Sequence, residues 1–171
     1  QLGDAVSVKL SDIIPFETLG AGAQGTVRKA VHKPSKKIIA LKEIPMQTDV
    51  KVQKSIILEL RTLHDCDHDN VLRSYGAFVQ DGTVKIALEF MDAGSLASIL
   101  QKTKKIPENI LGMMTHQIML GFQYLHKGMK VSHRDIKPSN ILLNTGGAIK
   151  IAPPGVTRTL PNTLAPLTTW V

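Results

Sequence analysis

Short runs of apolar residues, separated by turn residues, fill the first half of the chain. The runs on either side of a glycine-containing turn at 20–25, and the β-branched run 38–42, predict three strands. Residues 71–79 and 84–90 predict two more strands, and Asp81-Gly82 between them is a typical hairpin signal. Two groups of strands are therefore expected, one that ends at residue 42 and one over residues 71–90.

Helical spacing of apolar residues appears between these two groups of strands and after them. Residues 50–63 carry one apolar face, and Ser95 can cap a short helix over 96–102. The longest helix is expected from Pro107 to about His126, because proline suits a first helical turn. The residues predicted to form its buried face are Leu111, Met114, Ile118, Phe122 and Leu125.

Two smaller features complete this pattern. Met113, Met114 and Met119 are interpreted as packing residues rather than as a cofactor site. Residues 141–143 and 148–151 flank a turn that contains two glycines, so a final hairpin is expected there.

Composition limits the classes of function that fit. The chain has 171 residues, enough for one sizeable core or two small ones, and 43% of them are hydrophobic. Lys and Arg outnumber Asp and Glu by 21 to 14, and the resulting charge of +7 is spread along the chain. Aromatic residues make up only 4%, so no stacking surface for nucleic acid is visible. A phosphate site or an acidic partner explains the charge more simply.

The cellular setting follows from a few residue types. Cys66 is the only cysteine, so it cannot form an intrachain disulfide, and a reducing, cytoplasmic setting is expected. Cys66 is interpreted as a small buried hydrophobe. No apolar run reaches the length of about 18 residues needed for a membrane span, and no signal peptide is seen. Because the chain starts at Gln1, we expect a fragment, a processed product or an incomplete sequence.

Residues 133–140 read His-Arg-Asp-Ile-Lys-Pro-Ser-Asn and are followed by an apolar run. This H-R-D-x-x-x-x-N spacing supplies the residue types that phosphoryl transfer requires. Asp135 can accept the proton of an attacking hydroxyl, and Lys137 can place a cation near the transferred group. Asn140 can supply an oxygen ligand to Mg²⁺. The alternative is a chance match in a polar loop, which the rest of the chain disfavours.

Gly20, Gly22 and Gly25 form a G-x-G-x-x-G pattern that is followed by Val27. The pattern also occurs in dinucleotide-binding folds, where it opens a helix. Here it lies between two predicted strands, and a glycine hairpin lets backbone N–H groups approach phosphates. We therefore expect a phosphate-binding hairpin.

Lys42 ends the third predicted strand in an Ala-x-Lys sequence, where the alternative is an ordinary exposed lysine. Glu59, at the edge of the apolar face of the first predicted helix, is the candidate ion-pair partner of Lys42. Glu43 is nearer in sequence, but neighbouring side chains of a strand point to opposite faces. His64 and His68 are spaced like a metal pair, but no further ligand completes a site, so a hydrogen-bonded turn is preferred.

In this order, the glycine hairpin, Ala-x-Lys, helical glutamate and H-R-D-x-K-P-x-N motifs resemble a protein kinase. The lysine two places after Asp135 is typical of the serine/threonine type. Longer stretches of the sequence, which the next sentence gives, resemble the MAP kinase kinases, which are dual-specificity activators of MAP kinases. These stretches are Gly20-Ala21-Gly22, His32-Lys33-Pro34-Ser35, Leu63-His64, Tyr75-Gly76-Ala77-Phe78, Glu89-Phe90-Met91-Asp92-Ala93-Gly94-Ser95-Leu96 and Ile106-Pro107-Glu108.

The resemblance implies an α+β, protein-kinase-like fold. It implies an antiparallel small-lobe sheet with one helix, followed by the first, mainly helical part of a large lobe. The implied divisions are an N-terminal extension at 1–14, the small lobe at 15–90, a hinge at 91–95, a partial large lobe with the catalytic loop at 96–156, and the start of an activation segment at 157–171.

The resemblance also implies an ATP site between the lobes. Lys42 would hold the α- and β-phosphates and pair with Glu59, and the glycines would cover the phosphates. The other residues implied to bind ATP are Leu19 with the glycine hairpin, Val27, Ala40 and Leu142 around adenine, Leu88 at the gatekeeper position, and the backbones of Glu89 and Met91. The implied substrate is a Thr and a Tyr in a MAP kinase activation loop, and the implied activator is a MAP kinase kinase kinase.

Pro153-Pro154-Gly155 stands where the family has Asp-Phe-Gly. Proline has no side-chain oxygen, so the main Mg²⁺ ligand is missing and the metal would depend on Asn140 and solvent. Because the metal neutralises charge that develops on the phosphates, we expect this chain to be weak or inactive. A non-catalytic pseudokinase or nucleotide-binding scaffold is the alternative function.

The last residues carry two further expectations. Thr163 and Thr169 have the S/T-x₅-S/T spacing of phosphorylated activation segments in some members of the family, and a flexible Thr-rich tail is the alternative. The chain stops before the A-P-E motif of the family. We therefore expect the long helix to expose apolar surface and the isolated chain to be poorly stable.

Overall fold

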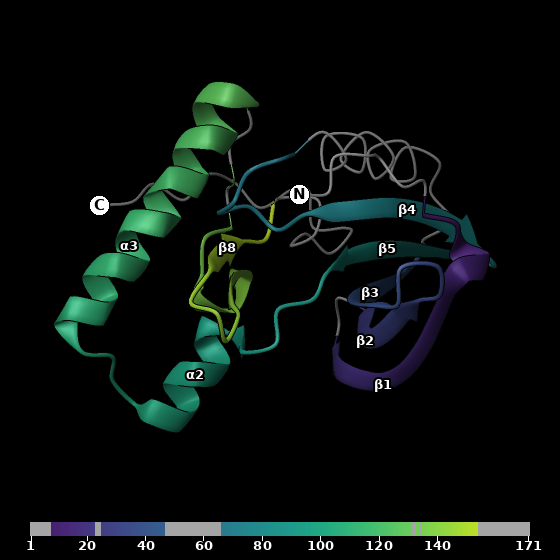
Figure 1. Ribbon diagram of the computed structural model, residues 1–171, viewed down its shortest axis with the longest axis horizontal. Helices are drawn as coiled ribbons and strands as arrows, with labels where there is room; N and C mark the ends of the chain where they lie inside the picture. Colours follow the sequence, from purple (N-terminus) through teal and green to yellow (C-terminus); the bar gives the residue numbers. More distant parts are fainter. Residues whose placement is uncertain (1–7, 23–24, 47–65, 131–132, 134, 154–171) are drawn as a thin grey trace.

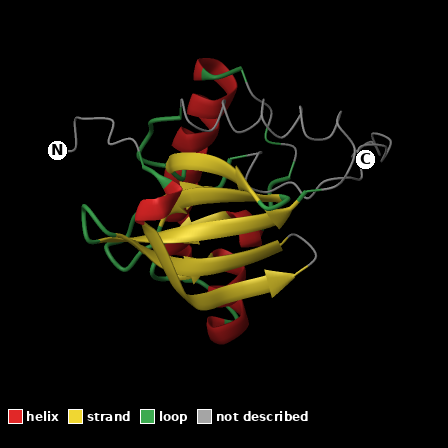
Figure 2. Cartoon of the chain, turned by 90° about the vertical axis from the view of Figure 1, so that its right-hand side faces the viewer, coloured by secondary structure: helices red, strands yellow, loops and turns green. Residues whose placement is uncertain are grey.

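A five-stranded antiparallel sheet forms one part of the molecule (Figure 1; Figure 2). The computed structural model describes residues 8–22, 25–46, 66–130, 133 and 135–153. After a 3₁₀ turn at Leu10–Asp12, the strands lie side by side in the order β1-β2-β3-β5-β4. Their bounds are β1 Ile13–Gly22, β2 Gly25–His32, β3 Lys37–Pro45, β4 Ser74–Gln80 and β5 Thr83–Glu89. The predicted antiparallel sheet is confirmed, whereas the helix expected at 50–63 lies outside the described residues.

Each face of this sheet carries an apolar cluster, because side chains of a strand alternate between the two faces. One cluster is formed by Ile13, Ala30, Ile39, Leu41 and Ala87, with Val8 and Leu10 packed against it. The other cluster is formed by Ile44, Leu72, Val84, Ile86, Leu88, Met91 and Ala152, with Ala40, Met46 and Leu142 packed against it. The second cluster includes Ala152 and contacts Leu142, which lie outside the five-stranded sheet. It therefore joins the sheet to the other part of the molecule.

The strand predicted at 71–79 is wrong at its start, since β4 begins only at Ser74. The preceding residues pair elsewhere: Val71 forms a parallel bridge with Ile151, and Leu72 N–H donates to the Ile151 carbonyl at 2.9 Å. Ile151 N–H in turn donates to the Asn70 carbonyl at 2.9 Å. The apolar run is therefore shared between two sheets, which alternation in the sequence cannot reveal.

A small three-stranded sheet and two helices form the other part (Figure 1). Ser95 caps helix α2 (Leu96–Thr103) as predicted, because its Oγ accepts a hydrogen bond from Ser98 N–H at 3.2 Å. A π-helical turn at Tyr124–Gly128 follows the long helix, and a 3₁₀ turn at Pro138–Asn140 precedes the final hairpin. The bounds of the elements are β6 Gly94–Ser95, α2 Leu96–Thr103, α3 Glu108–Gln123, β7 Ile141–Leu143 and β8 Ile149–Ile151.

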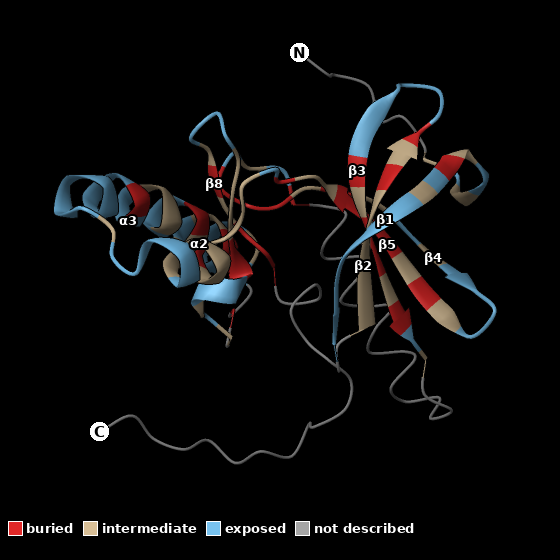
Figure 3. Cartoon of the chain, turned by 90° about the horizontal axis from the view of Figure 1, so that it is seen from below, coloured by how far each residue is buried: buried red, intermediate tan, exposed pale blue. Residues whose placement is uncertain are grey.

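The buried side of α3 is narrower than its apolar spacing predicted (Figure 3). Met114 is buried, but Leu111 is 47% exposed, so its assignment to the buried face was wrong. Met113 and Met119 are each 58% exposed, and they are therefore not packing residues in this structure. The apolar surface expected on this helix is present.

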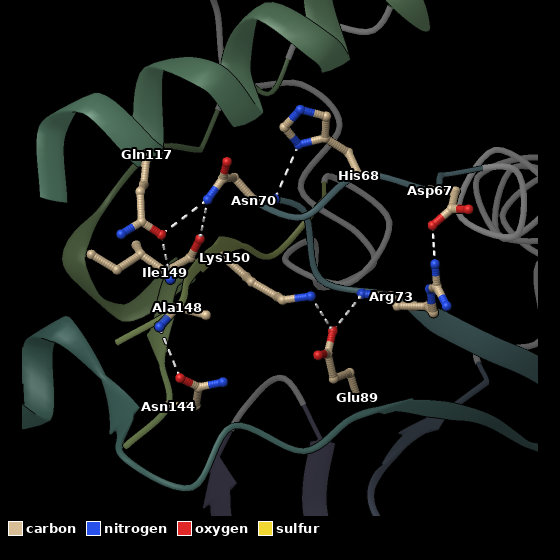
Figure 4. Close-up of polar contacts among 10 residues, drawn as sticks. All are labelled: Asp67, His68, Asn70, Arg73, Glu89, Gln117, Asn144, Ala148, Ile149 and Lys150. Atoms are coloured by element: carbon tan, nitrogen blue, oxygen red, sulfur yellow. Dashed lines mark hydrogen bonds and ion pairs between the residues drawn. The ribbon is translucent and has the colours of Figure 1, made fainter. Parts of the chain in front are cut away.

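Polar contacts fasten α3 to β8 and to the segment before β4 (Figure 4). Gln117 Oε1 accepts hydrogen bonds from Ile149 N–H at 3.0 Å and from Asn70 Nδ2 at 3.1 Å. Asn70 is buried and also donates through Nδ2 to the Ile149 carbonyl at 3.0 Å. Each of these buried polar groups thus has a partner, as a stable interior requires.

The backbone of Asn70 passes so close to α3 that Gly121 faces it directly. A Cβ on Gly121 would lie 2.6 Å from the Asn70 carbonyl oxygen, and 2.9 Å from Cδ1 of Ile151. By contrast, a Cβ on Gly112 of the same helix would meet nothing within 4 Å.

Gly121→Ala should therefore lower the free energy of unfolding by about 1–3 kcal/mol, since the overpacked backbone must shift. Gly112→Ala is the matched control and should be neutral or stabilising by up to about 1 kcal/mol, the gain expected from helix propensity. Urea denaturation of both variants measures the difference. Equal effects at the two positions would show that Asn70 does not pack on α3 in this way.

Candidate active site

The described residues of the H-R-D-x-x-x-x-N motif form a connected group of polar contacts. Asp135 Oδ2 lies 3.1 Å from Lys137 Nζ and accepts a hydrogen bond from Asn140 Nδ2 at 3.0 Å. Asn140 Nδ2 also donates to the Asp135 backbone carbonyl at 2.7 Å. Both side-chain contacts use the same carboxylate oxygen. The structure therefore brings together the three residues that the sequence singled out here.

The turn that carries these residues is held by β8. Asn140 N–H donates to the Lys137 carbonyl at 2.9 Å, which closes the 3₁₀ turn that begins at Pro138. Ala152 N–H donates to the Asn140 carbonyl at 2.9 Å, just beyond the end of β8. The amide side chain of Asn140 is thus placed by two backbone bonds of its own residue.

His133 has a role that the sequence reasoning did not assign. Its Nε2 lies 2.7 Å from the Ala152 carbonyl, and its Nδ1 lies 3.3 Å from Asp135 N–H. Because Nδ1 must accept from that N–H, Nε2 carries the proton and donates to Ala152. The ring is buried and meets the Phe122 ring edge-on at 5.8 Å. The first position of the motif was the available signal for this residue.

Lys42 is a buried lysine on β3, 7% exposed. It stands between Val27 of β2 and Ile86 of β5 in the sheet register. Burial, and to a smaller extent repulsion by Lys137, lowers the pKa of Lys42 to about 8. Lys137 is therefore close enough to Lys42 for the two charges to interact.

Two of the residues predicted to enclose adenine pack on the cluster that joins the two parts of the molecule. Ala40 from β3 and Leu142 from β7 both contact it, and Leu88 and Met91 are buried members of it. Glu89 N–H donates to the Arg73 carbonyl at 3.0 Å. The Glu89 side chain forms an ion pair with Lys150 at 2.8 Å, which ties the end of β5 to β8 (Figure 4).

Glycine is required by packing at one position of the hairpin but not at the other two. Gly25 has φ +97°, and a Cβ there would lie 2.1 Å from the Glu43 carbonyl oxygen, so the fold itself requires glycine. At Gly20 and Gly22 a Cβ would meet nothing within 4 Å. Packing among the described residues therefore does not explain these two glycines, whereas close approach of a ligand would. Leu19 precedes them and is 46% exposed.

Comparison with known proteins decides the family. The protein kinase domain family matches residues 14–170. The chain belongs to the protein kinase family. Its sequence is similar to that of a MAP kinase kinase: it is 45% identical over 166 residues to dual specificity mitogen-activated protein kinase kinase 1 of Dictyostelium discoideum. The aligned region covers 97% of this chain and 25% of that protein. The chain thus spans about a quarter of the length of that curated relative.

Protein kinases use ATP and Mg²⁺, and the described residues of this kinase fit the metal poorly. Pro153 is fully buried directly after Ala152 and offers no side-chain oxygen. Among the described residues, no group of three or more His, Cys, Asp and Glu could hold a metal ion. Asn140 remains a predicted ligand through Oδ1, because its Nδ2 faces Asp135.

Several predicted residues lie outside the part of the kinase that the structure describes. They are Glu59, Pro154, Gly155, Thr163 and Thr169. The predicted ion pair of Lys42 with Glu59 therefore stays a prediction. In the described part, no helix has the length and apolar character needed to cross a membrane.

The lowered pKa of Lys42 gives the kinase a pH-dependent stability. The ordinary value of 10.5 applies to the unfolded chain, and the folded value is about 8. Between these values the unfolded chain binds more protons, so the free energy of unfolding should rise with pH from about 8 to about 10.5. The total rise should be on the order of 3 kcal/mol, because one pKa unit corresponds to about 1.4 kcal/mol.

Urea denaturation across this pH range measures the rise. Lys42→Met should lose it, and Lys37→Met, on the same strand but exposed, should keep it. An undiminished rise in Lys42→Met would mean that another group is responsible.

Proposed function

We propose that this chain is the nucleotide-binding and catalytic-loop part of a MAP kinase kinase, and that the whole enzyme phosphorylates Thr and Tyr in the activation loop of a MAP kinase. The observation that carries the proposal is the contact between Asp135, Lys137 and Asn140, beside which the buried Lys42 lies close enough for Lys137 to lower its pKa. A carboxylate and two cations with these relations suit phosphoryl transfer to a hydroxyl.

ATP would lie with adenine against Val27, Ala40 and Leu142. Because Glu89 N–H already donates to Arg73, the Glu89 carbonyl and the Met91 N–H are the groups we propose for the adenine edge. Leu88 would line the inner end of the adenine site. The triphosphate would run beneath Gly20 and Gly22, where open space lets backbone N–H groups approach it, toward Lys42.

In the proposed reaction the hydroxyl oxygen of the substrate attacks the γ-phosphorus, and the bond from that phosphorus to the β,γ-bridging oxygen breaks, which releases ADP. Asp135 takes the hydroxyl proton on Oδ1, since Oδ2 is held by Lys137 and Asn140. Lys137 stabilises negative charge on the transferred group, and Lys42 holds the α- and β-phosphates. Mg²⁺, when bound, neutralises charge on the phosphates.

We also propose that this chain transfers phosphate weakly, because Pro153 replaces a carboxylate metal ligand. The same observation favours a second candidate, a non-catalytic nucleotide-binding protein of kinase descent. For the whole enzyme, we propose activation by a MAP kinase kinase kinase, with Thr163 and Thr169 as candidate sites of phosphorylation. A cytoplasmic location is proposed from the single cysteine, and no nucleic-acid partner is proposed.

Restoring the metal ligand should restore activity. In the full-length protein, Pro153→Asp combined with Pro154→Phe should raise phosphorylation of a MAP kinase substrate by about 100-fold or more, since a lost metal ligand removes several kcal/mol of transition-state stabilisation. Incorporation of labelled phosphate into the substrate gives the rate. Asp135→Asn in the restored protein is the control and should abolish the gain. If the restored protein stays folded but inactive, the assigned site is wrong.

Mg²⁺ dependence of ATP binding separates the metal site from the nucleotide site. For this chain, Mg²⁺ should change the ATP dissociation constant by less than about twofold, because the described donors do not form a full ligand set. In the variant with both substitutions, Mg²⁺ should tighten ATP binding by about tenfold or more. Isothermal titration calorimetry with and without Mg²⁺ measures both values. A strong Mg²⁺ effect in this chain would show that other groups replace the missing carboxylate.

A further inference from the structure

A bulge in β1 brings two consecutive side chains against one lysine of β2. Pro15 pairs with Ala30 and Thr18 with Arg28, so Phe16 and Glu17 together stand opposite Lys29. In a regular strand, neighbours point to opposite faces, whereas a bulge re-aims one of them. Here Glu17 Oε1 lies 2.9 Å from Lys29 Nζ, and the Phe16 ring centroid lies 5.7 Å from it.

The same ammonium group reaches the segment that follows β5. Lys29 Nζ lies 5.2 Å from the centroid of the Phe90 ring. The Lys29 side chain is only 28% exposed, so its contacts with the two rings are partly shielded from solvent. A cation over an aromatic face is attracted by the negative potential of the ring, and the attraction grows as water is removed. Lys29 therefore links β1, β2 and Phe90.

The position of this link relates it to the nucleotide. Lys29 pairs with Ala40, and Val27, two residues earlier on β2, points to the same face and pairs with Lys42. Phe90 lies between Glu89 and Met91, whose backbones are the proposed adenine partners. The link thus joins the strands above the proposed adenine site to the segment along its edge.

We propose that Lys29 is a positioning residue that sets the spacing between the β1–β2 strands and the segment at Phe90, and so the width of the adenine site. The inference rests on the proposed nucleotide-binding function. Glu17 and Phe16 orient the ammonium group, and Phe90 receives it. Lys29 acts through these strands and does not contact the phosphates, so it favours adenosine, ADP and ATP to the same extent.

Dissociation constants for adenosine, ADP and ATP, measured by isothermal titration calorimetry on the chain and its variants, test this role. Lys29→Met keeps the length of the side chain but not its charge, and should weaken all three ligands equally, by about threefold to tenfold. Lys29→Arg keeps a cation over the rings and should bind within about twofold of the unchanged chain. Lys37→Met, an exposed lysine on β3, is the matched control and should bind normally.

A second set of variants tests whether Phe90 is the residue through which Lys29 acts. Phe90→Leu should weaken the three ligands as Lys29→Met does, and the double variant should be no weaker than either single variant, because both remove the same contact. Thermal unfolding should show that these variants fold like the unchanged chain.

Three results would overturn the inference in distinguishable ways. If Lys29→Met weakens ATP but not adenosine, Lys29 contacts the phosphates directly. If the unchanged chain binds all three ligands and Lys29→Met binds them equally well, the link is structural only. If the unchanged chain binds none of them, the proposed function fails, and this inference fails with it.

Discussion

Backbone hydrogen bonds at the end of β8 hold several distant segments of the described chain in place. Ile151 exchanges backbone hydrogen bonds with Asn70 and Leu72, so the segment before β4 cannot move independently of β8. One residue later, the N–H of Ala152 donates to the Asn140 carbonyl, and the Ala152 carbonyl accepts a hydrogen bond from His133 Nε2. A single short strand therefore joins the segment that leads into β4 to the proposed catalytic loop. Buried backbone groups must find partners, which is why this arrangement resists local rearrangement.

Pro153 follows this strand, and it suits the fold but not the proposed binding of a metal ion. A proline has no N–H to satisfy, and its ring is fully buried beside Ala152, so the position suits the interior of the protein. A carboxylate there would serve a metal ion, but proline cannot. The contacts of Asp135 with Lys137 and Asn140 form without that carboxylate. The proposed catalytic loop is thus assembled although this position carries no carboxylate to bind a metal ion.

Much of the fold and of the site was predictable because the signals are local. The hairpin at Asp81-Gly82, the cap at Ser95 and the contacts of the catalytic loop depend on residues within five positions of each other. The errors involve distant partners. The start of β4 was misplaced because Val71 pairs with Ile151, and Leu111 was assigned to a buried face although it is exposed. A helical period shows which face is apolar, but not how much of it another element covers.

The sequence alone predicted the protein kinase family, most strands and helices of the described residues, and the residue types of the proposed catalytic loop. It did so because turn chemistry, capping and motif spacing act over short distances along the chain. Three contacts could be seen only once the chain was folded: the hydrogen bond of His133 to the Ala152 carbonyl, the repulsion between Lys42 and Lys137, and the position of Lys29 near the rings of Phe16 and Phe90. These relations join residues that are distant in sequence or set by a bulge. The strength of these electrostatic contacts depends on how far folding removes the groups from water, which the sequence does not specify.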